Sequence, residues 1–461
     1  MRKYIAALIA GVALIGACKD STAVPDFNNP DYLDLLGKPL TKPTLQNLIT
    51  GYHDAQRASL GVAPASYIVF AETMARDAYR TDASESRYIN EFLNGTPDPG
   101  AFSGSSNWTT FYRDIRAANT LLDVIPTLPA SEGVSAAQQT ATIGMVQTMK
   151  AIDYYKALEY RDTVGIALDV NHALGEPLAP LVCKPKALAF ISALLDTGYT
   201  NLLAGGSSFP VTLPPGFAGF NTPGKFALFN RGWKGKVELY RALDHQAPTG
   251  AAGFTAAINA INASFINTTD PAQIGNGVYF TFSTAPGDTP NQLIDSNLHL
   301  NPQISDSLQP GDLRGSKIVT LAKSSTIQGV TYKANFNATQ LSPIAYLKNE
   351  ELILLRAQAK VGLGDLAGAL ADVNFVRAAA GGLAPLPAFA NATAAIDAIL
   401  REKRYSLLME SAHRLVDLRA YGRLNNTFFK KELGGDIFLK ALPIPQNEAD
   451  QRGGVLTVTC N

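Results

Sequence analysis

Apolar residues recur at intervals of three and four over much of the chain. Near its beginning the pattern is carried by Leu45, Leu48, Ile49 and Tyr52. This spacing places apolar side chains on one face of an α-helix, so it predicts helices that pack through that face. The segment 45–163 is therefore expected to be mainly helical, with one helix at 142–160, and further helices are expected at 185–203 and 230–242.

The helical pattern is clearest near the end of the chain. A helix over 346–362, a tight turn over 362–365 and a second helix over 366–380 form a predicted αα-hairpin. Small Ala357 and Ala369 would let the two helices approach closely, as in tetratricopeptide repeats. A long helix is expected from Thr393, a plausible N-cap, to Tyr421, with Gly422 as its stop. The fold class is therefore mainly α.

Two segments depart from the helical pattern. The stretch 209–226 is rich in Pro, Gly and Phe, which predicts an ordered loop between two helices. The stretch 268–342 shows little helical periodicity and holds short β-like pieces at 278–282 and 317–321. We expect an irregular, loop-rich subregion with short β-hairpins there.

The first residues have the form of an export signal. Arg2 and Lys3 precede an apolar run over 4–15, which ends in Gly16-Ala17-Cys18. The run is shorter than the roughly 20 apolar residues that span a bilayer. Its end resembles the lipobox of bacterial lipoproteins, in which the cysteine is acylated. The sequence thus predicts a signal peptide over 1–17, acylation of Cys18, a polar tether over 18–30 and a folded body over 31–461.

Charge and composition exclude some partners. Lys plus Arg and Asp plus Glu both number 39, so no basic field for nucleic acid exists. The five histidines form no metal-ligand pair, and the chain has neither a nucleophile elbow nor a P-loop. No metal or cofactor is predicted. Cys183 and Cys460 could form a disulfide in an exported protein or remain two buried thiols, and sequence alone does not decide between them.

Five segments, in order along the chain, resemble one protein family. They are Trp108, Tyr112, Ile115, Ala118-Asn119 and Leu122; Gly311-Asp312-Leu313-Arg314; Ala357, Gly364-Asp365, Ala369, Asn374 and Arg377; Arg401-Glu402-Lys403-Arg404, Glu410, His413-Arg414, Asp417-Leu418-Arg419 and Gly422; and Leu442-Pro443-Ile444-Pro445-Gln446-Asn447-Glu448. This set is similar to the motifs of the SusD/RagB family and spans roughly 26–456.

The resemblance implies a single SusD-like helical domain with tetratricopeptide-like helix pairs. It also implies a non-enzymatic lipoprotein of the outer membrane, exposed at the cell surface. Such a protein caps a SusC-like TonB-dependent β-barrel and delivers oligosaccharides, or peptides, to it.

Two other functions stay open. One is a surface enzyme acting on glycosides, which needs two converging carboxylates. The other is a structural helical adaptor without a small-molecule site.

Aromatic side chains outside regular helices are the predicted ligand contacts, because a flat ring matches the C–H face of a sugar. They are Tyr79, Tyr88, Phe92, Phe102, Phe217 and Phe220. The alternative is that these rings merely anchor loops. Trp108 and Trp233 lie within helical periodicity and are expected in the core.

The cluster His413, Arg414, Asp417 and Arg419 has two interpretations. A catalytic or anion site is one of them. The favoured one is a helix-surface or interhelical ion network of Arg414, Asp417 and Glu410 that fixes how the long helix docks.

Overall fold

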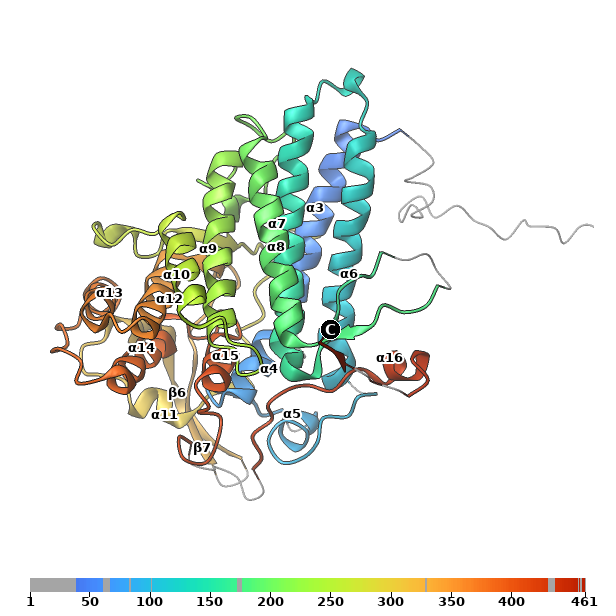
Figure 1. Cartoon of the computed structure of the whole chain (residues 1–461). Helices are drawn as coiled ribbons and strands as arrows, with labels where there is room; N and C mark the ends of the chain where they lie inside the picture. The colour runs from blue at the N-terminus through green and yellow to red at the C-terminus, as the bar shows by residue number, and fades with distance from the viewer. Residues whose placement is uncertain are drawn as a thin grey trace, which may run out of the picture.

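The computed structural model describes residues 39–60, 67–82, 84–100, 102–171, 176–327, 330–429, 436–454, 456 and 458–460. The predicted signal peptide 1–17, the acylation site Cys18 and the tether 18–30 lie outside the described residues. Figure 1 shows a mainly helical molecule in which long helices stand side by side and the few strands gather at one end. No helix of the described part is long and apolar enough to cross a membrane.

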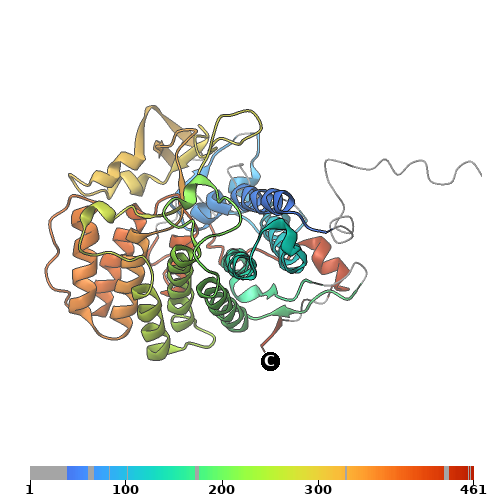
Figure 2. The same ribbon diagram turned by 90° about the horizontal axis from the view of Figure 1, so that it is seen from above.

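The first half is built from long antiparallel helices. They are α3 (Lys42–Ser59), α6 (Phe102–Val124), α7 (Ala136–Arg161), α8 (Lys184–Leu203), α9 (Pro223–Ala242) and α10 (Gly250–Asn262). Each packs against the next, and α7 begins at a capping box in which Ser135 and Gln138 bond each other's backbone N–H. Figure 2 shows these helices following one another in an arc. The helices predicted at 142–160, 185–203 and 230–242 are confirmed.

The predicted αα-hairpin is also confirmed. It consists of α12 (Asn349–Gly362) and α13 (Leu366–Ala379), and Gly364 at the turn has a φ of 79°, which favours glycine. Asp365 caps α13 by accepting a hydrogen bond from the Gly368 N–H at 2.8 Å. The hairpin packs against α14 (Ala392–Ser406).

The single long helix expected from Thr393 to Tyr421 is wrong. The structure has two helices, α14 and α15 (His413–Ala420), and the N-cap of α14 is Asn391 rather than Thr393. The chain bends where Met409 has a φ of 60°, and the Met409 N–H donates to the Glu72 carboxylate at 3.0 Å. A tertiary contact therefore interrupts a segment whose local pattern favours one helix.

The strands form three small sheets. In the first, β1 (Ala78–Arg80), β5 (Leu298–Leu300), β7 (Val330–Phe336) and β6 (Ile318–Ile327) lie in that order. The second pairs β4 (Gly277–Phe280) with β8 (Ile344–Lys348), and the third holds β2 (Ile166–Ala167), β3 (Leu181–Val182) and β9 (Val458–Thr459). Because β6 and β7 form a hairpin within 268–342, the expected loop-rich subregion with short strands is confirmed.

Short helices fill the connections. They are α4 (Tyr67–Met74), α5 (Arg87–Asn90), α11 (Pro302–Asp306), α16 (Gln446–Gln451) and the 3-10 turns η2 (Ile125–Thr127), η3 (Ala130–Glu132), η4 (Asp162–Val164), η5 (Pro215–Phe217), η6 (Pro271–Gln273) and η7 (Leu313–Lys317). One apolar cluster runs through α3, α4, α6, α7, α8 and α9 and forms the main core. It includes Trp108 and Trp233, in agreement with the packing role expected for both.

The end of the chain is fastened to the helical body. Strand β9 pairs in parallel with β3, with Leu181 opposite Val458. Cys183 follows β3 directly, is the N-cap residue of α8, and forms a disulfide with Cys460, their Cα atoms being 5.3 Å apart. The structure therefore has the disulfide rather than the two free thiols.

Candidate functional site

An open cleft lies where α3 meets two loops far away in sequence. We call it the α3 cleft, and its volume is about 550 Å³. It is lined by Gln46, Thr50, Asp54 and Arg57 of α3, by Thr212, Leu213, Pro214 and Pro215, and by Thr281, Phe282, Ser283, Gly287 and Asp288. Charged, amide and hydroxyl side chains therefore surround a space large enough for a small ligand.

Arg57 is the central charged group of the α3 cleft. Its guanidinium donates to the carbonyl oxygen of Thr281 at 2.9 Å and pairs with the Asp288 carboxylate. A carboxylate oxygen of Asp54 lies 3.4 Å from the same guanidinium, and the ring of Phe282 lies beneath it, with its centroid 5.9 Å away. Arg57 thus holds the segment after β4 against α3 and fixes two carboxylates at the cleft.

Gln46 fastens the second loop. Its side-chain amide donates to the Thr212 carbonyl oxygen at 3.0 Å and accepts from the Thr212 N–H at 2.7 Å. The loop also approaches β4 so closely that a Cβ atom at Gly216 would lie 1.7 Å from the carbonyl oxygen of Tyr279. Only glycine fits there, so Gly216 determines how Pro214 and Pro215 reach the cleft.

The α3 cleft offers both hydrogen-bond donors and acceptors. Burial would raise the pKa of Asp288, but hydrogen bonds from the Thr289 N–H and from Arg57 hold it below its usual value. Asp288 is therefore an ionised acceptor at neutral pH. Asp54, with 56% of its side chain exposed, presents a second carboxylate to solvent. Carboxylates, an amide and hydroxyls at this spacing suit a ligand rich in hydroxyl groups.

The predicted aromatic contacts do not line this cleft. Five of the six side chains are buried: Tyr79, Tyr88, Phe92, Phe217 and Phe220 are each at most 3% exposed. Most of them pack on other rings, as Phe217 does on Phe226 with ring centroids 5.7 Å apart. The prediction that these five rings contact a ligand is therefore wrong for the structure described, and the alternative, that the rings anchor the surrounding segments, agrees with their burial. The physical reason is that burying an aromatic ring removes a large apolar area from water, and nearby elements cover each ring.

The sixth candidate, Phe102, is the first residue of α6, and its side chain lies outside what the structure describes.

A sequence signal for the cleft did exist. The cleft residues of α3 follow one another at helical spacing, four, four and three residues apart, on a face without apolar residues. Such a polar stripe is usually a solvated helix face. What distinguishes this stripe is the pair of loops that lie over it, and those loops come from elsewhere in the chain.

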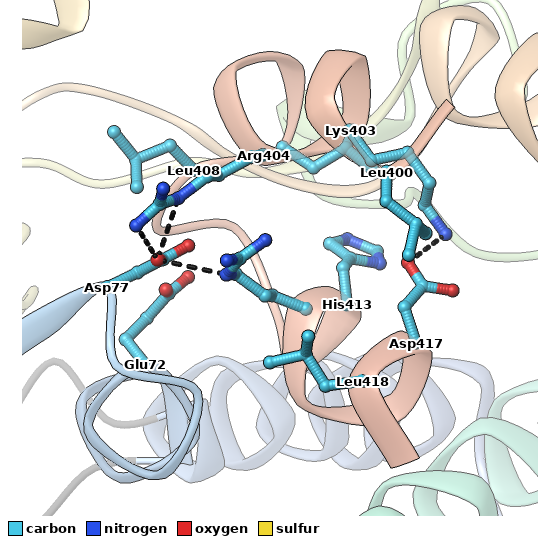
Figure 3. Close-up of a pocket in the computed structure, with 11 residues that line it drawn as sticks. Glu72, Asp77, Leu400, Lys403, Arg404, Leu408, His413, Asp417 and Leu418 are labelled. Carbon is cyan, nitrogen blue, oxygen red and sulfur yellow. Dashed lines mark hydrogen bonds and ion pairs between the residues drawn. The ribbon is translucent and has the colours of Figure 1, made fainter. Parts of the chain in front are cut away.

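The cluster around His413 is buried between α4, α14 and α15. Figure 3 shows Arg404 directed at Asp77 and Lys403 at Asp417. The nearest N–O distances are 2.7 Å from Arg404 to Asp77, 3.0 Å from Arg414 to Asp77 and 2.6 Å from Lys403 to Asp417. The space among these side chains is about 10 Å³, which is room for about one water molecule.

The electrostatics agree with a structural role for this cluster. Burial, reinforced by Lys236 and Lys403, holds the pKa of His413 well below its usual value, so the ring is neutral. Arg419 turns away and donates to the backbone carbonyl oxygens of Glu159 and Lys440. Arg414 and Asp417 belong to an interhelical ion network, as the favoured interpretation had it, and the space within the network is too small for a substrate.

The residues that the structure describes contain no group of three or more His, Cys, Asp and Glu side chains that could bind a metal ion.

Comparison with known proteins relates the whole architecture to solved structures. No protein-family model and no curated protein sequence matches the chain. NanU of B. fragilis is 14% identical with a TM-score of 0.66, covering 95% of this chain and 98% of its own. A SusD superfamily protein from Parabacteroides distasonis is 15% identical with a TM-score of 0.67, covering 92% and 99%. A laminarin-binding SusD-like protein is 17% identical with a TM-score of 0.62, covering 89% and 98%. At these identities the similarity establishes the fold.

Proposed function

This chain has the SusD fold, the fold that its sequence motifs led us to expect, and from that premise we propose that it is a glycan-binding lipoprotein. In this proposal Cys18 anchors it to the outer membrane, and it passes oligosaccharides to a SusC-like TonB-dependent transporter. Two proteins of similar structure have names that refer to carbohydrate binding. One is called a SusD-like carbohydrate-binding protein and the other a laminarin-binding SusD-like protein.

The α3 cleft carries the proposal. Arg57, Asp54 and Asp288 form a fixed polar cluster beside an open volume of about 550 Å³. Because Arg57 already orients both carboxylates, a sugar would meet hydrogen-bond acceptors that need little reordering. The near equality of acidic and basic residues in the chain suits a neutral glycan.

Calorimetry on the purified chain tests the cleft, with a panel of neutral oligosaccharides that includes laminarin fragments and with a parallel peptide panel. Asp54→Ala removes an exposed acceptor and should weaken the best ligand about tenfold, since a hydrogen bond to a charged group contributes about 1.5–3 kcal/mol. The control is Asn47→Ala on an exposed position of the same helix that does not line the cleft. Equal affinities for the two variants would place the glycan elsewhere.

The lipid anchor requires its own experiment. Cells fed a labelled fatty acid should incorporate the label into the wild-type chain but not into Cys18→Ala, because acylation takes place on the sulfur. The wild-type chain should sediment with outer membranes, held by acyl chains that contribute about 0.8 kcal/mol per buried methylene. Label retained by the variant would refute acylation at Cys18.

The transporter partner is tested by co-purification. The tagged chain should bring down a TonB-dependent β-barrel from membranes of its own cells, at a fixed stoichiometry. Clean dissociation from every barrel would refute the delivery step and leave only binding. A chain that neither binds a ligand nor a barrel would favour the structural-adaptor alternative.

One observation bears on an enzymatic alternative. Asp54 and Asp288 both contact the guanidinium of Arg57, so two carboxylates do converge at the cleft. A glycosidase, however, needs one carboxyl with a raised pKa as general acid, whereas the pKa of Asp288 is lowered. We expect no turnover of the oligosaccharides that bind. Release of reducing ends that disappears in Asp54→Asn would establish the enzyme instead.

A further inference from the structure

A second cavity, of about 260 Å³, lies between α14, α15 and the segment that follows α15. We call it the arginine pocket. Among the residues that line it are Arg401, Arg404, Arg414, Arg423 and Asp397. It shares no lining residue with the α3 cleft, so it is a second site, and an inference about the sugar that it binds rests on the proposed glycan binding.

The wall of the arginine pocket carries more positive than negative charge. Arg404 and Arg414 pair with the same carboxylate, Asp77, at 2.7 and 3.0 Å. Glu72 lies beside them, and burial and the nearby Asp77 raise its pKa well above the usual value. Two guanidiniums therefore share one carboxylate in a site with restricted access to water.

The mouth of the pocket adds two further guanidiniums. Arg423 pairs with Asp397 at 2.7 Å, but 56% of the Asp397 side chain is exposed. Arg401 is exposed and forms no ion pair with any residue that the structure describes. Since acidic and basic residues are equal in number over the whole chain, this excess of positive charge is local. A planar guanidinium binds a carboxylate through two parallel hydrogen bonds, which a neutral hydroxyl cannot match.

An exposed aromatic ring stands beside these charges. Phe428 is 52% exposed and lies under the guanidinium of Arg423, whose carbon is 5.2 Å from the ring centroid. Tyr405 and Leu418 contribute to the same wall. An exposed ring adjoining guanidiniums suits a ligand that has both an apolar face and an anionic group. A pyranose with a carboxylate has both features.

We propose that the arginine pocket binds a carboxylate-bearing sugar unit of an oligosaccharide. In this arrangement the sugar ring stacks on Phe428. Its carboxylate accepts hydrogen bonds from Arg401 and from the arginines of the wall.

The test compares a trigalacturonate with a neutral trigalactoside in calorimetry on the purified full chain. The wild-type chain should bind the acidic trimer at least about tenfold more tightly at this site, because charge-assisted hydrogen bonds are roughly twice as strong as neutral ones. Arg401→Gln should remove most of that preference. Lys225→Gln changes the net charge equally at an exposed position of α9 that is outside the pocket, and it should preserve the preference.

One further variant and several further ligands identify what the arginine pocket recognises. Phe428→Ala should weaken trigalacturonate without affecting acetate or inorganic phosphate, if the ring contacts the sugar. Acetate or phosphate binding as tightly as trigalacturonate would reduce the pocket to a simple anion site and overturn the sugar assignment. Tighter binding of an acidic tripeptide would also overturn it. So would equal affinity for the two trimers, or equal effects of Arg401→Gln and Lys225→Gln.

Discussion

His53 gives a quantitative test of how burial sets the stability of this fold. It lies on the inner face of α3, 4% exposed, with its ring centroid 5.0 Å from that of Phe217. Burial lowers its pKa from 6.5 to about 4. The folded protein therefore holds the ring neutral at pH values where the unfolded chain protonates it.

The sign and the size follow from linkage. Between pH 6.5 and pH 4 the unfolded chain binds more protons at His53 than the folded protein does, so stability falls as the pH falls through this window. Between pH 7.5 and pH 4.5 the loss attributable to His53 is about 2.5 kcal/mol. His53→Phe removes the titrating group. Any packing cost of the larger ring is independent of pH, so the difference between the two pH values isolates the titration.

Urea unfolding at pH 7.5 and at pH 4.5 measures the effect. Relative to wild type, His53→Phe should gain about 2.5 kcal/mol at the lower pH compared with the higher one. His245→Gln serves as the control, because it removes an exposed imidazole without changing the core. A His53→Phe effect that is the same at both pH values, or no larger than that of His245→Gln, would refute the reasoning.

Three further substitutions test other parts of the structure. Asp77→Asn should destabilise the protein by about 3–5 kcal/mol, because the two arginines that it pairs with stay buried without a carboxylate; a small shift in the urea midpoint would contradict this. Gly216→Ala should lower the melting temperature far more than Gly224→Ala, since a Cβ atom at Gly216 would meet the backbone of β4 and one at Gly224 meets nothing within 4 Å; equal melting temperatures would argue against the close approach. Cys183→Ser should cost about 2–4 kcal/mol and abolish any response to reductant, and a wild-type protein equally stable when reduced would count against the disulfide.

The comparison of sequence with structure is informative at α14 and α15. The periodicity of 393–421 indicates one helix, yet the backbone bends at Met409, where Glu72 of α4 accepts its N–H. The bend lets Arg404 and Arg414, on different helices, reach the same carboxylate of Asp77. Local propensity cannot contain this information, because Asp77 is more than three hundred residues away in the chain.

The candidate sites show the same limit of prediction from local sequence. The aromatic residues Tyr79, Phe92 and Phe217 stand outside long helices, which made them plausible ligand contacts, but whether a ring is exposed depends on what covers it. The α3 cleft combines one helix with loops near residues 212 and 281, and no spacing in the sequence relates them. The polar stripe on α3 could be seen in advance, but its partners could not.

The sequence by itself determined the features that depend on neighbouring residues. It indicated the helices from their apolar spacing, the hairpin from its glycines and small residues, the family fold from motifs in order, and the export signal that remains a prediction. Tertiary structure alone decided which rings are buried, where 393–421 bends, which arginines share a carboxylate and which loops enclose a cleft. The physical reason is that burial and ion pairing depend on distances between side chains that the chain brings together only on folding.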